Sequence, residues 1–269
     1  MLHLSVFATL LAVTAAIGGA SPGKDPENCT RTGKAELRIS ACSEAILSEG
    51  FLGSNVAAAY RLRGLAFSDA RDYRRAITDY DWALRINPSD SAVYFERATA
   101  YTRLQDYSQA IEDYDRSLHL EPGNPQAYFL RGVNNYQLGE HSQAIIDYGQ
   151  ALVLDPEYSP VYNERAWVLY LVGRNSEALE DTAQALSRHP RMAPALDTRA
   201  HVLAALGRPS EALIEFERAI DAGGKSFVRM YQKALIRHGH YTGETDGVYG
   251  AEVRAALAAC LEEHCRLVK

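Results

Sequence analysis

Arginines and carboxylates recur along this sequence at a fixed separation. Five arginines stand 34 residues apart, and each is followed 16 residues later by an aspartate or a glutamate. A guanidinium and a carboxylate can pair through two parallel hydrogen bonds, whereas an unpaired guanidinium can bind an anionic ligand. The pairs are Arg63 with Asp79, Arg97 with Asp113, Arg131 with Asp147, Arg165 with Asp181, and Arg199 with Glu215.

Two interpretations fit these columns. If each arginine lies on one helix and its acid on the antiparallel helix that follows, the pairs are structural and join the two helices. The alternative is a groove in which five arginines bind an anion. The acid column favours structural pairs, because the charges then neutralise one another. Such pairs fix helix register more than they add net stability, since a partly buried ion pair gains little over an apolar replacement.

The remaining residues capable of chemistry form no catalytic constellation. The eight histidines are scattered along the chain, and no Walker-type phosphate-binding loop is present. Neighbouring acids such as Asp79 and Asp81 belong to the repeating pattern. We therefore expect no enzyme activity and no cofactor.

The four cysteines form two local pairs, one near each end of the chain. Cys29 stands near Cys42, and Cys260 stands near Cys265. Three connectivities are open, and an oxidising compartment favours pairing between neighbours. A Cys260–Cys265 bond requires the last helix to end within Leu261-Glu262-Glu263-His264, because the separation is too long to bridge along an unbroken helix. We do not expect a metal site, because neither pair has zinc-ligand spacing and no histidine cluster lies close by.

The 34-residue period extends to small, aromatic and proline positions. The apolar residues recur at helical spacing, and short polar turns separate them, so the period indicates a helix-turn-helix unit. The proline column marks the end of each second helix. The prolines are Pro88, Pro122, Pro156 and Pro190, and the most regular small column is Ala76, Ala110, Ala144, Ala178 and Ala212.

The pattern resembles the tetratricopeptide repeat family. The segments Tyr60-Arg61-Leu62-Arg63-Gly64 and Tyr128-Phe129-Leu130-Arg131-Gly132 carry this resemblance best. It implies an all-α fold in which about five repeats over residues 57–224 stack into a right-handed helical solenoid. Residues 21–56 would precede the repeats as a disulfide-stapled segment with a capping helix at about 34 to 48.

The resemblance also implies that one face of each first helix binds a protein or peptide partner. The alternative is that these side chains pack against neighbouring helices or against the chain terminus. The apolar and aromatic residues of this face gather in the middle repeats, with one asparagine as a polar handle. They are Phe95, Phe129, Val133, Tyr136, Asn163, Trp167 and Tyr170.

Residues 225–269 resemble the peptidoglycan-binding-like domain. The resemblance rests on a Tyr-x-Gly-x-x-Asp-Gly-x-x-Gly turn between two expected helices. Val253 and Ala251 depart from the family pattern, and a small helical cap docked on the fifth repeat is the alternative. The residues of the turn are Tyr241, Gly243, Asp246, Gly247 and Gly250.

Residues 1–20 have the pattern of a secretory signal peptide with cleavage after Ala20, and an uncleaved membrane anchor is the alternative. The mature chain shows no further membrane-spanning run. The formal net charge of −6 argues against a nucleic-acid surface. The sequence therefore predicts a periplasmic or secreted interaction scaffold of a bacterial envelope. A peptidoglycan-binding protein with the repeats as spacer is the competing prediction.

Overall fold

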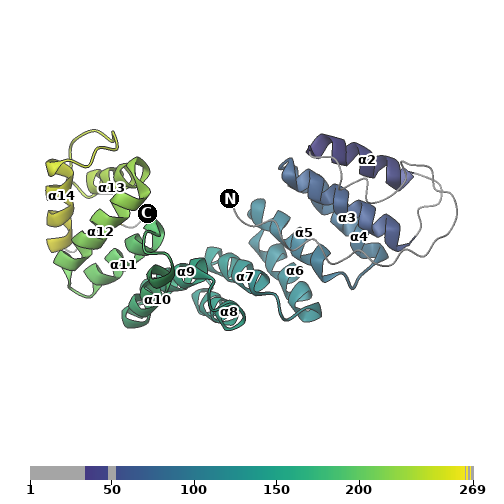
Figure 1. Ribbon diagram of the computed structural model, residues 1–269, viewed down its shortest axis with the longest axis horizontal. Helices are drawn as coiled ribbons and strands as arrows, with labels where there is room; N and C mark the ends of the chain where they lie inside the picture. The colour runs from purple at the N-terminus through teal and green to yellow at the C-terminus, as the bar shows by residue number, and fades with distance from the viewer. Residues whose placement is uncertain (1–33, 48–52, 264, 266, 268–269) are drawn as a thin grey trace. The chain divides into compact units, whose positions relative to one another are not determined.

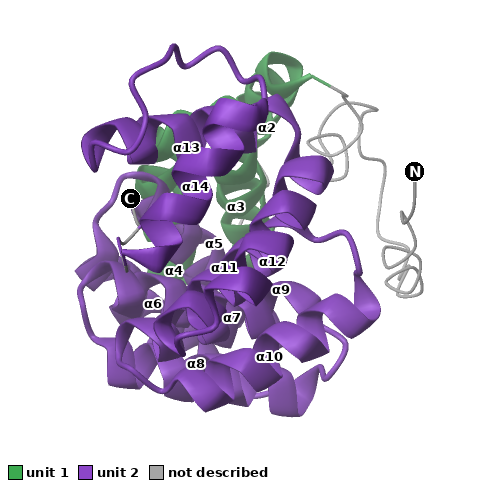
Figure 2. Cartoon of the chain, turned by 90° about the vertical axis from the view of Figure 1, so that its left-hand side faces the viewer, with its two compact units in different colours: residues 1–86 green, residues 87–269 purple. Residues whose placement is uncertain are grey.

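The computed structural model describes residues 34–47, 53–263, 265 and 267. The regular secondary structure of these residues consists of α-helices (Figure 1). Within the repeats, short turns connect each helix to the next. The chain divides into two compact units, residues 1–86 and 87–269 (Figure 2). The expected all-α class with tandem helix hairpins is confirmed.

Unit 1 contains a capping helix and one helix hairpin. The capping helix α2 (Ala35–Leu47) lies where the sequence predicted a helix, and it packs against α3 (Ser54–Asp69), which pairs with α4 (Tyr73–Ile86). Cys42 and Ala45 of α2 meet Ala59 of α3 in a small buried cluster. The expected partner of Cys42, Cys29, lies outside the described residues, as do the predicted signal peptide and its cleavage site.

Unit 2 contains four consecutive helix hairpins followed by two more helices. Within it, first helices of successive hairpins contact one another, in the pairs α5 with α7, α7 with α9 and α9 with α11. These contacts make the first helices one layer of the stack. The first helices are α5 (Ser91–Arg103), α7 (Pro125–Gln137), α9 (Ser159–Leu171) and α11 (Ala193–Ala205), and the second helices are α6 (Tyr107–Leu120), α8 (His141–Leu154), α10 (Asn175–Arg188) and α12 (Pro209–Gly223).

Local sequence explains where these helices begin and end. Asp90 and Asn124 cap α5 and α7, because each side chain accepts hydrogen bonds from two backbone N–H groups of the first turn. The turn inside each hairpin contains one residue with positive φ, such as Gly139 at 81°. The second helices α4, α6, α8 and α10 each end two residues before a repeat proline, at Ile86, Leu120, Leu154 and Arg188.

The last two helices dock on the fifth repeat, as expected for a cap. Helices α13 (Lys225–Arg237) and α14 (Ala251–Glu262) share one buried cluster with α11 and α12. Phe216 of α12 packs edge-to-face on Tyr231 of α13, with ring centroids 5.3 Å apart. The Tyr231 hydroxyl also donates to Asp197 on α11 at 2.5 Å.

Cys260 and Cys265 form a disulfide, with their Cα atoms 5.1 Å apart. The geometry allows this because α14 ends at Glu262, before the second cysteine. No helix in the described part of the chain is both long and apolar enough to cross a membrane.

Candidate partner-binding surface

Each of the first four arginines in the repeating column meets its predicted acid across a helix hairpin. We call these pairs the arginine–acid ladder. Hydrogen bonds to Asp181 raise the pKa of the Arg165 guanidinium, so the arginine stays charged throughout the physiological range. The N···O distances are 2.7 Å for Arg63–Asp79, 2.6 Å for Arg97–Asp113, 2.6 Å for Arg131–Asp147 and 2.7 Å for Arg165–Asp181.

A tyrosine three residues before each of these arginines covers the guanidinium. An arginine over an aromatic ring gains from the negative face of the ring and shields its apolar surface. The distances from the guanidinium carbon to the ring centroid are 5.4 Å for Tyr60, 5.6 Å for Tyr94, 5.4 Å for Tyr128 and 5.9 Å for Tyr162.

The fifth pair of the ladder differs from the other four. Arg199 Nε lies 3.7 Å from Glu215 Oε1, and this nitrogen has no hydrogen-bond partner among the described residues. Glu215 instead accepts from Arg218 on its own helix at 2.9 Å. Glutamate is one methylene longer than aspartate, so its carboxylate reaches a neighbour one turn away. In the other four pairs the arginine charges are already neutralised, which supports the structural interpretation over an anion groove.

The seven residues predicted to bind a partner lie on α5, α7 and α9, but they have different surroundings. Phe95 packs edge-to-face on Tyr114 with centroids 5.7 Å apart. Phe129 packs on Tyr148 and Tyr158, at 5.9 Å and 5.3 Å. Val133 is partly buried against the same apolar cluster as Phe129. These three partly buried side chains therefore take part in packing, which is the alternative that the sequence left open.

Asn163 does not provide the exposed polar handle that the sequence predicted. Its side chain is only 5% exposed, and its Oδ1 accepts a hydrogen bond from Thr198 of the next first helix at 2.9 Å. The stacking of α9 on α11 buries this position, because the two residues face each other across neighbouring repeats. Asn163 therefore joins repeats and does not face a ligand.

The remaining three residues form one aromatic cluster together with a histidine. We define this aromatic cluster as Tyr136, Trp167, Tyr170 and His201. Trp167 Nε1 donates to the Tyr136 hydroxyl at 3.1 Å, and the Trp167 and Tyr170 rings lie 5.4 Å apart. His201 packs edge-to-face against Trp167 at 5.7 Å. Contacts between three successive first helices therefore fix these partly exposed rings in place.

A cavity of about 510 Å³ opens beside the aromatic cluster. Tyr170, His201 and Phe216 line it on one side, and Leu261 and Leu267 line it on the other. Asn175, at the start of α10, also lines it, and its buried Oδ1 has no hydrogen-bond partner among the described residues. No pattern in the sequence indicates this cavity, because Leu261, Cys265 and Leu267 line it only after the chain end folds back.

His201 forms part of the cavity wall and is uncharged at neutral pH. It is 6% exposed, and its ring meets that of Phe216 edge-to-face at 5.0 Å. Burial lowers the pKa of the His201 imidazole, and the carboxylate of Asp197 opposes this only in part. The cavity is therefore bounded by neutral aromatic groups, and its unpaired polar atom is an amide oxygen.

The Asp–Gly turn between α13 and α14 is held from within by a buried glutamine. Gln232 is completely buried, and its Nε2 donates to Asp246 Oδ1 at 2.8 Å. Its Oε1 accepts from the backbone N–H of Gly247 at 2.9 Å. The hydrogen bond from Gln232 to Asp246, followed by one from the Val248 backbone N–H, lowers the pKa of the Asp246 carboxyl.

The other residues of the predicted wall-binding turn also have local roles. Asp246 Oδ1 accepts from Val248 N at 2.9 Å, and the Tyr241 hydroxyl donates to the Glu244 carbonyl at 3.3 Å. Gly247 adopts a φ of 81° and lies against the Lys225 carbonyl, while Gly243 faces the Tyr241 ring. Gly250 precedes α14, with open space where a side chain would stand. The motif therefore builds the turn.

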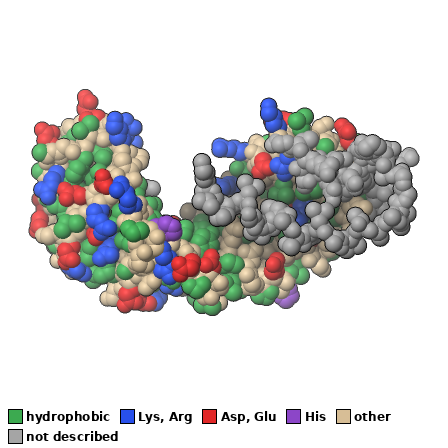
Figure 3. All heavy atoms as spheres, viewed as in Figure 1, with side chains coloured by type: hydrophobic (Ala, Val, Ile, Leu, Met, Phe, Trp, Pro, Cys, Tyr) green, Lys and Arg blue, Asp and Glu red, His purple; other side chains and the backbone are tan. Residues whose placement is uncertain are grey.

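On the one face of unit 2 in view, charged side chains of both signs are mixed. Figure 3 shows basic and acidic side chains interspersed over α12, α13 and α14 on the face in view, without a basic patch. A mixed surface does not provide the continuous positive field that binds nucleic acid phosphates.

Solved structures that resemble this chain show the fold. A crystal structure of MamA is 22% identical with a TM-score of 0.57, covering 60% of this chain and 94% of that chain. A MamA structure from Desulfovibrio magneticus RS-1 is 18% identical with a TM-score of 0.57, covering 62% and 92%. YrrB, described as a TPR protein with an unusual peptide-binding site, is 21% identical with a TM-score of 0.60, covering 68% and 93%.

Comparison with curated proteins found no match. The family model of the tetratricopeptide repeat matches residues 61–125, 95–159 and 163–227, which together make up more than half of the chain. These matches span all five repeats that the 34-residue period defines. The chain belongs to the tetratricopeptide repeat family.

Proposed function

We propose that this protein is a non-catalytic, exported scaffold that binds an extended peptide segment of a protein partner. The observation that carries the proposal is the cavity beside the aromatic cluster, because aromatic and aliphatic side chains line it together with polar groups. Membership of the tetratricopeptide repeat family supports a role in protein interaction. The peptide-binding site named for YrrB supports the same class of ligand.

The chemistry of the cavity defines the peptide that would fit. Tyr170, His201 and Phe216 offer neutral aromatic surface, so an apolar side chain of the partner enters there. Asn175 lines the same cavity, and its side-chain amide offers a polar contact to the peptide backbone. The rest of the peptide runs along Trp167 and Tyr136 on the neighbouring first helices.

The two tryptophans allow a direct test. Trp82 lies in unit 1 and Trp167 in the aromatic cluster, so Trp82→Phe leaves Trp167 as the sole tryptophan. Peptides selected from a random library on the full chain are titrated into this variant while Trp167 emission is followed. We expect a saturable change in emission and a preference for peptides with an apolar anchor residue.

Two matched variants show whether binding uses this surface. Tyr170→Ala should weaken peptide affinity at least about tenfold, because aromatic anchors in a pocket dominate binding energy. Tyr107→Ala changes a tyrosine at the start of α6, outside the aromatic cluster, and should leave affinity unchanged. Peptides that bind equally well to both variants, or that leave Trp167 emission unaltered, would contradict the proposal.

Export is part of the proposal and rests on residues 1–20. Their apolar, small-residue pattern is that of a secretory signal, and a disulfide such as Cys260–Cys265 is typical of oxidising compartments. The protein isolated from envelope fractions should begin at Ser21. A chain that still begins at Met1 would contradict cleavage, and recovery from the cytosol would contradict export.

Peptidoglycan is the alternative partner, through the C-terminal turn. The observation in its favour is that Thr242, Glu244 and Thr245 stand exposed at the tip of this turn. Deletion of residues 225–269 would expose the core shared with α12, so a point change tests the idea better. If the wall is the partner, the protein sediments with purified sacculi and Thr245→Arg reduces that fraction, whereas Tyr170→Ala does not.

A further inference from the structure

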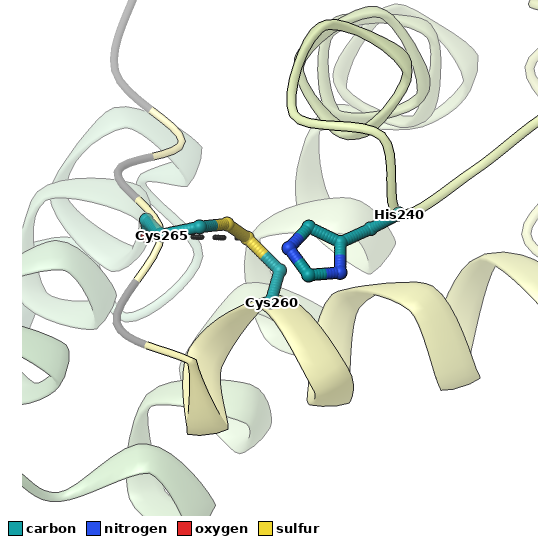
Figure 4. Close-up of side chains that lie close together, drawn as sticks. All are labelled: His240, Cys260 and Cys265. Atoms are coloured by element: carbon teal, nitrogen blue, oxygen red, sulfur yellow. Dashed lines mark hydrogen bonds between the residues drawn. A yellow bond between two sulfur atoms is a disulfide. The ribbon is translucent and has the colours of Figure 1, made fainter.

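His240 lies beside both cysteines of the C-terminal disulfide. A ring nitrogen of His240 and the sulfurs of Cys260 and Cys265 all lie within 4.8 Å of one another. Figure 4 shows a ring nitrogen of the imidazole turned toward the two sulfurs. The sequence argued against a metal site because no histidine cluster lies close to either cysteine pair. The structure corrects that argument, because the turn between α13 and α14 brings a histidine back from 20 residues earlier.

The backbone fixes all three positions. His240 N–H donates to the Leu235 carbonyl at 2.9 Å, which anchors the histidine to the end of α13. Cys265 N–H donates to the Cys260 carbonyl at 2.9 Å, which turns the chain back over the end of α14. Cys260 is completely buried and belongs to the core cluster shared with α12. The three side chains therefore converge without needing the disulfide to hold them.

This donor set suits a zinc ion. Zinc takes thiolate sulfur at about 2.3 Å and imidazole nitrogen at about 2.0–2.1 Å, so tetrahedral ligands lie about 3.5–3.8 Å apart. Opening the sulfur–sulfur bond brings the three atoms into that range with small side-chain rotations. Two thiolates neutralise the charge of Zn²⁺, which matters because an uncompensated charge in a buried site is costly.

We propose that His240, Cys260 and Cys265 form a Zn²⁺ site when the disulfide is reduced. The imidazole binds through the nitrogen that faces the sulfurs. The Glu263 carboxylate, 3.9 Å from His240 Nε2, provides an oxygen donor at the exposed rim for the fourth position. The site and the disulfide exclude each other, because a disulfide sulfur is not a thiolate ligand.

The exchange between the two states balances with a dithiol reductant. One thiolate of the reductant attacks a sulfur of the disulfide, and its second thiol resolves the mixed disulfide. The reductant becomes a disulfide, and Cys260 and Cys265 receive two electrons and two protons. Binding of Zn²⁺ then releases those two protons as both thiols become thiolates.

Either state fastens the chain end to the core. Leu267, two residues beyond Cys265, is 5% exposed and packs in the same core cluster as Leu257 and Leu261. A small two-helix module has little core of its own, so a cross-link near its end contributes to its stability. Under reducing conditions, bound zinc therefore takes over the cross-linking role of the Cys260–Cys265 disulfide.

The test uses the full chain in its oxidised and reduced forms. The protein is reduced with a phosphine, desalted without oxygen and titrated with Co²⁺, whose thiolate charge-transfer and visible bands report coordination by sulfur. We expect the reduced protein to bind one equivalent of Co²⁺ with these bands, Zn²⁺ to displace it, and the oxidised protein to show none. One equivalent of Zn²⁺ should also restore the melting temperature lost on reduction.

Variants assign the ligands. His240→Ala should weaken metal affinity at least about tenfold, since even changes outside the direct ligands cost about 10–100-fold. Cys265→Ser should remove most of the sulfur-to-cobalt intensity. His238→Ala is the matched control, because this exposed histidine ends α13 without joining the three ligands, and it should bind as the wild type does.

Several results would overturn the proposal. The first is a folded, reduced protein that binds no Co²⁺, and the second is an oxidised protein that binds Co²⁺ as well as the reduced one. The third is a set of sulfur-to-cobalt bands that survives Cys265→Ser or is unaffected by His240→Ala. If reduction alone unfolds the last helices, reduction in the presence of one equivalent of Zn²⁺ must keep them folded. Failure to do so in circular dichroism would also overturn it.

Discussion

Arg131 illustrates how a charged residue serves the interior of a repeat protein. Its guanidinium bonds to Asp147 through two nitrogens, at 2.6 Å and 3.1 Å, and it reaches Asp115 at 2.5 Å with a third. Asp147 is completely buried, and Asn135 donates to it at 2.9 Å. Removing the arginine therefore leaves a carboxylate without its counter-charge in a site that water does not reach.

Arg131→Leu should lower the free energy of unfolding by about 3–5 kcal/mol, the cost of leaving one member of a buried ion pair unpaired. Urea unfolding followed by circular dichroism measures it. The matched change Arg199→Leu should cost less than about 1 kcal/mol, because Glu215 keeps Arg218 as its partner.

Equal losses for the two variants would contradict this account of the ladder. The functional alternative makes a different prediction. If Arg131 bound an anionic ligand, Arg131→Leu would reduce affinity for that ligand and leave the unfolding midpoint unchanged.

His201 predicts a dependence of stability on pH. Burial lowers its pKa in the folded protein below the unfolded value of about 6.5. The unfolded chain therefore takes up the proton first as the pH falls. The contribution of neutral His201 is fully present above about pH 6.5 and declines below it, by at most about 1.4 kcal/mol per pH unit for one proton.

His201→Phe should remove this decline, because phenylalanine keeps the aromatic packing and does not titrate. Melting temperatures measured from pH 7.5 to pH 5 compare the two proteins. His119→Phe, at an exposed position of α6, should keep the wild-type slope. A His201→Phe slope equal to that of the wild type would show that other groups carry the acid sensitivity.

At the scale of the elements, the turn inside each hairpin has the same geometry in all five repeats. The residue that turns the chain adopts a positive φ, at positions 34 residues apart. Glycine accepts this conformation without strain, whereas a residue with a side chain pays about 1–2 kcal/mol. The residues and their φ values are Arg71 61°, Gln105 63°, Gly139 81°, Gly173 79° and Gly207 72°.

Gln105→Gly should therefore stabilise the protein by about 0.5–1 kcal/mol, the relief of strain less the extra freedom of glycine in the unfolded chain. Gly139→Ala should destabilise it by about 1 kcal/mol. An added Cβ at Gly139 meets no atom within 4 Å, so its effect reports the backbone alone. Thermal unfolding of both variants tests the pair, and changes of the same sign would refute the explanation.

The element between α13 and α14 shows why a sequence motif can be present without its expected ligand role. Gln232 bonds to Asp246, to Gly247 and to the carbonyl of Val248 at 3.3 Å. Asp246 and Gly247 of the motif are thus required by the turn itself. A recognition role belongs to the exposed tip, and the turn presents that tip whether or not a wall partner exists.

At the scale of the whole molecule, the repeats of unit 2 each cover an apolar face of the repeat before them. This pattern runs from α5 to α12, and α13 and α14 close it. The capping helices bury the face that the fifth repeat would otherwise expose. Because this cap also lines the cavity through Leu261 and Leu267, the stability of the chain end and the shape of the proposed peptide site are linked.

The sequence alone determined the hairpins, their turns and the arginine–acid ladder. These features depend on contacts within one repeat, between residues 16 positions apart, and a helix hairpin sets such contacts by its own geometry. The disulfide at Cys260 and Cys265 was predictable for the same reason, because its two residues are five apart.

Only the tertiary structure decided which side chains face a ligand. Asn163 became buried through Thr198 of the next repeat, and Trp167 was fixed by Tyr136 of the previous one. His240 came to lie beside Cys260 only because the connection between α13 and α14, residues 238–250, folds back on α14. Such contacts depend on the rotation of one repeat relative to the next and on the path of the chain end. The helical periodicity within one repeat specifies neither the rotation nor the path.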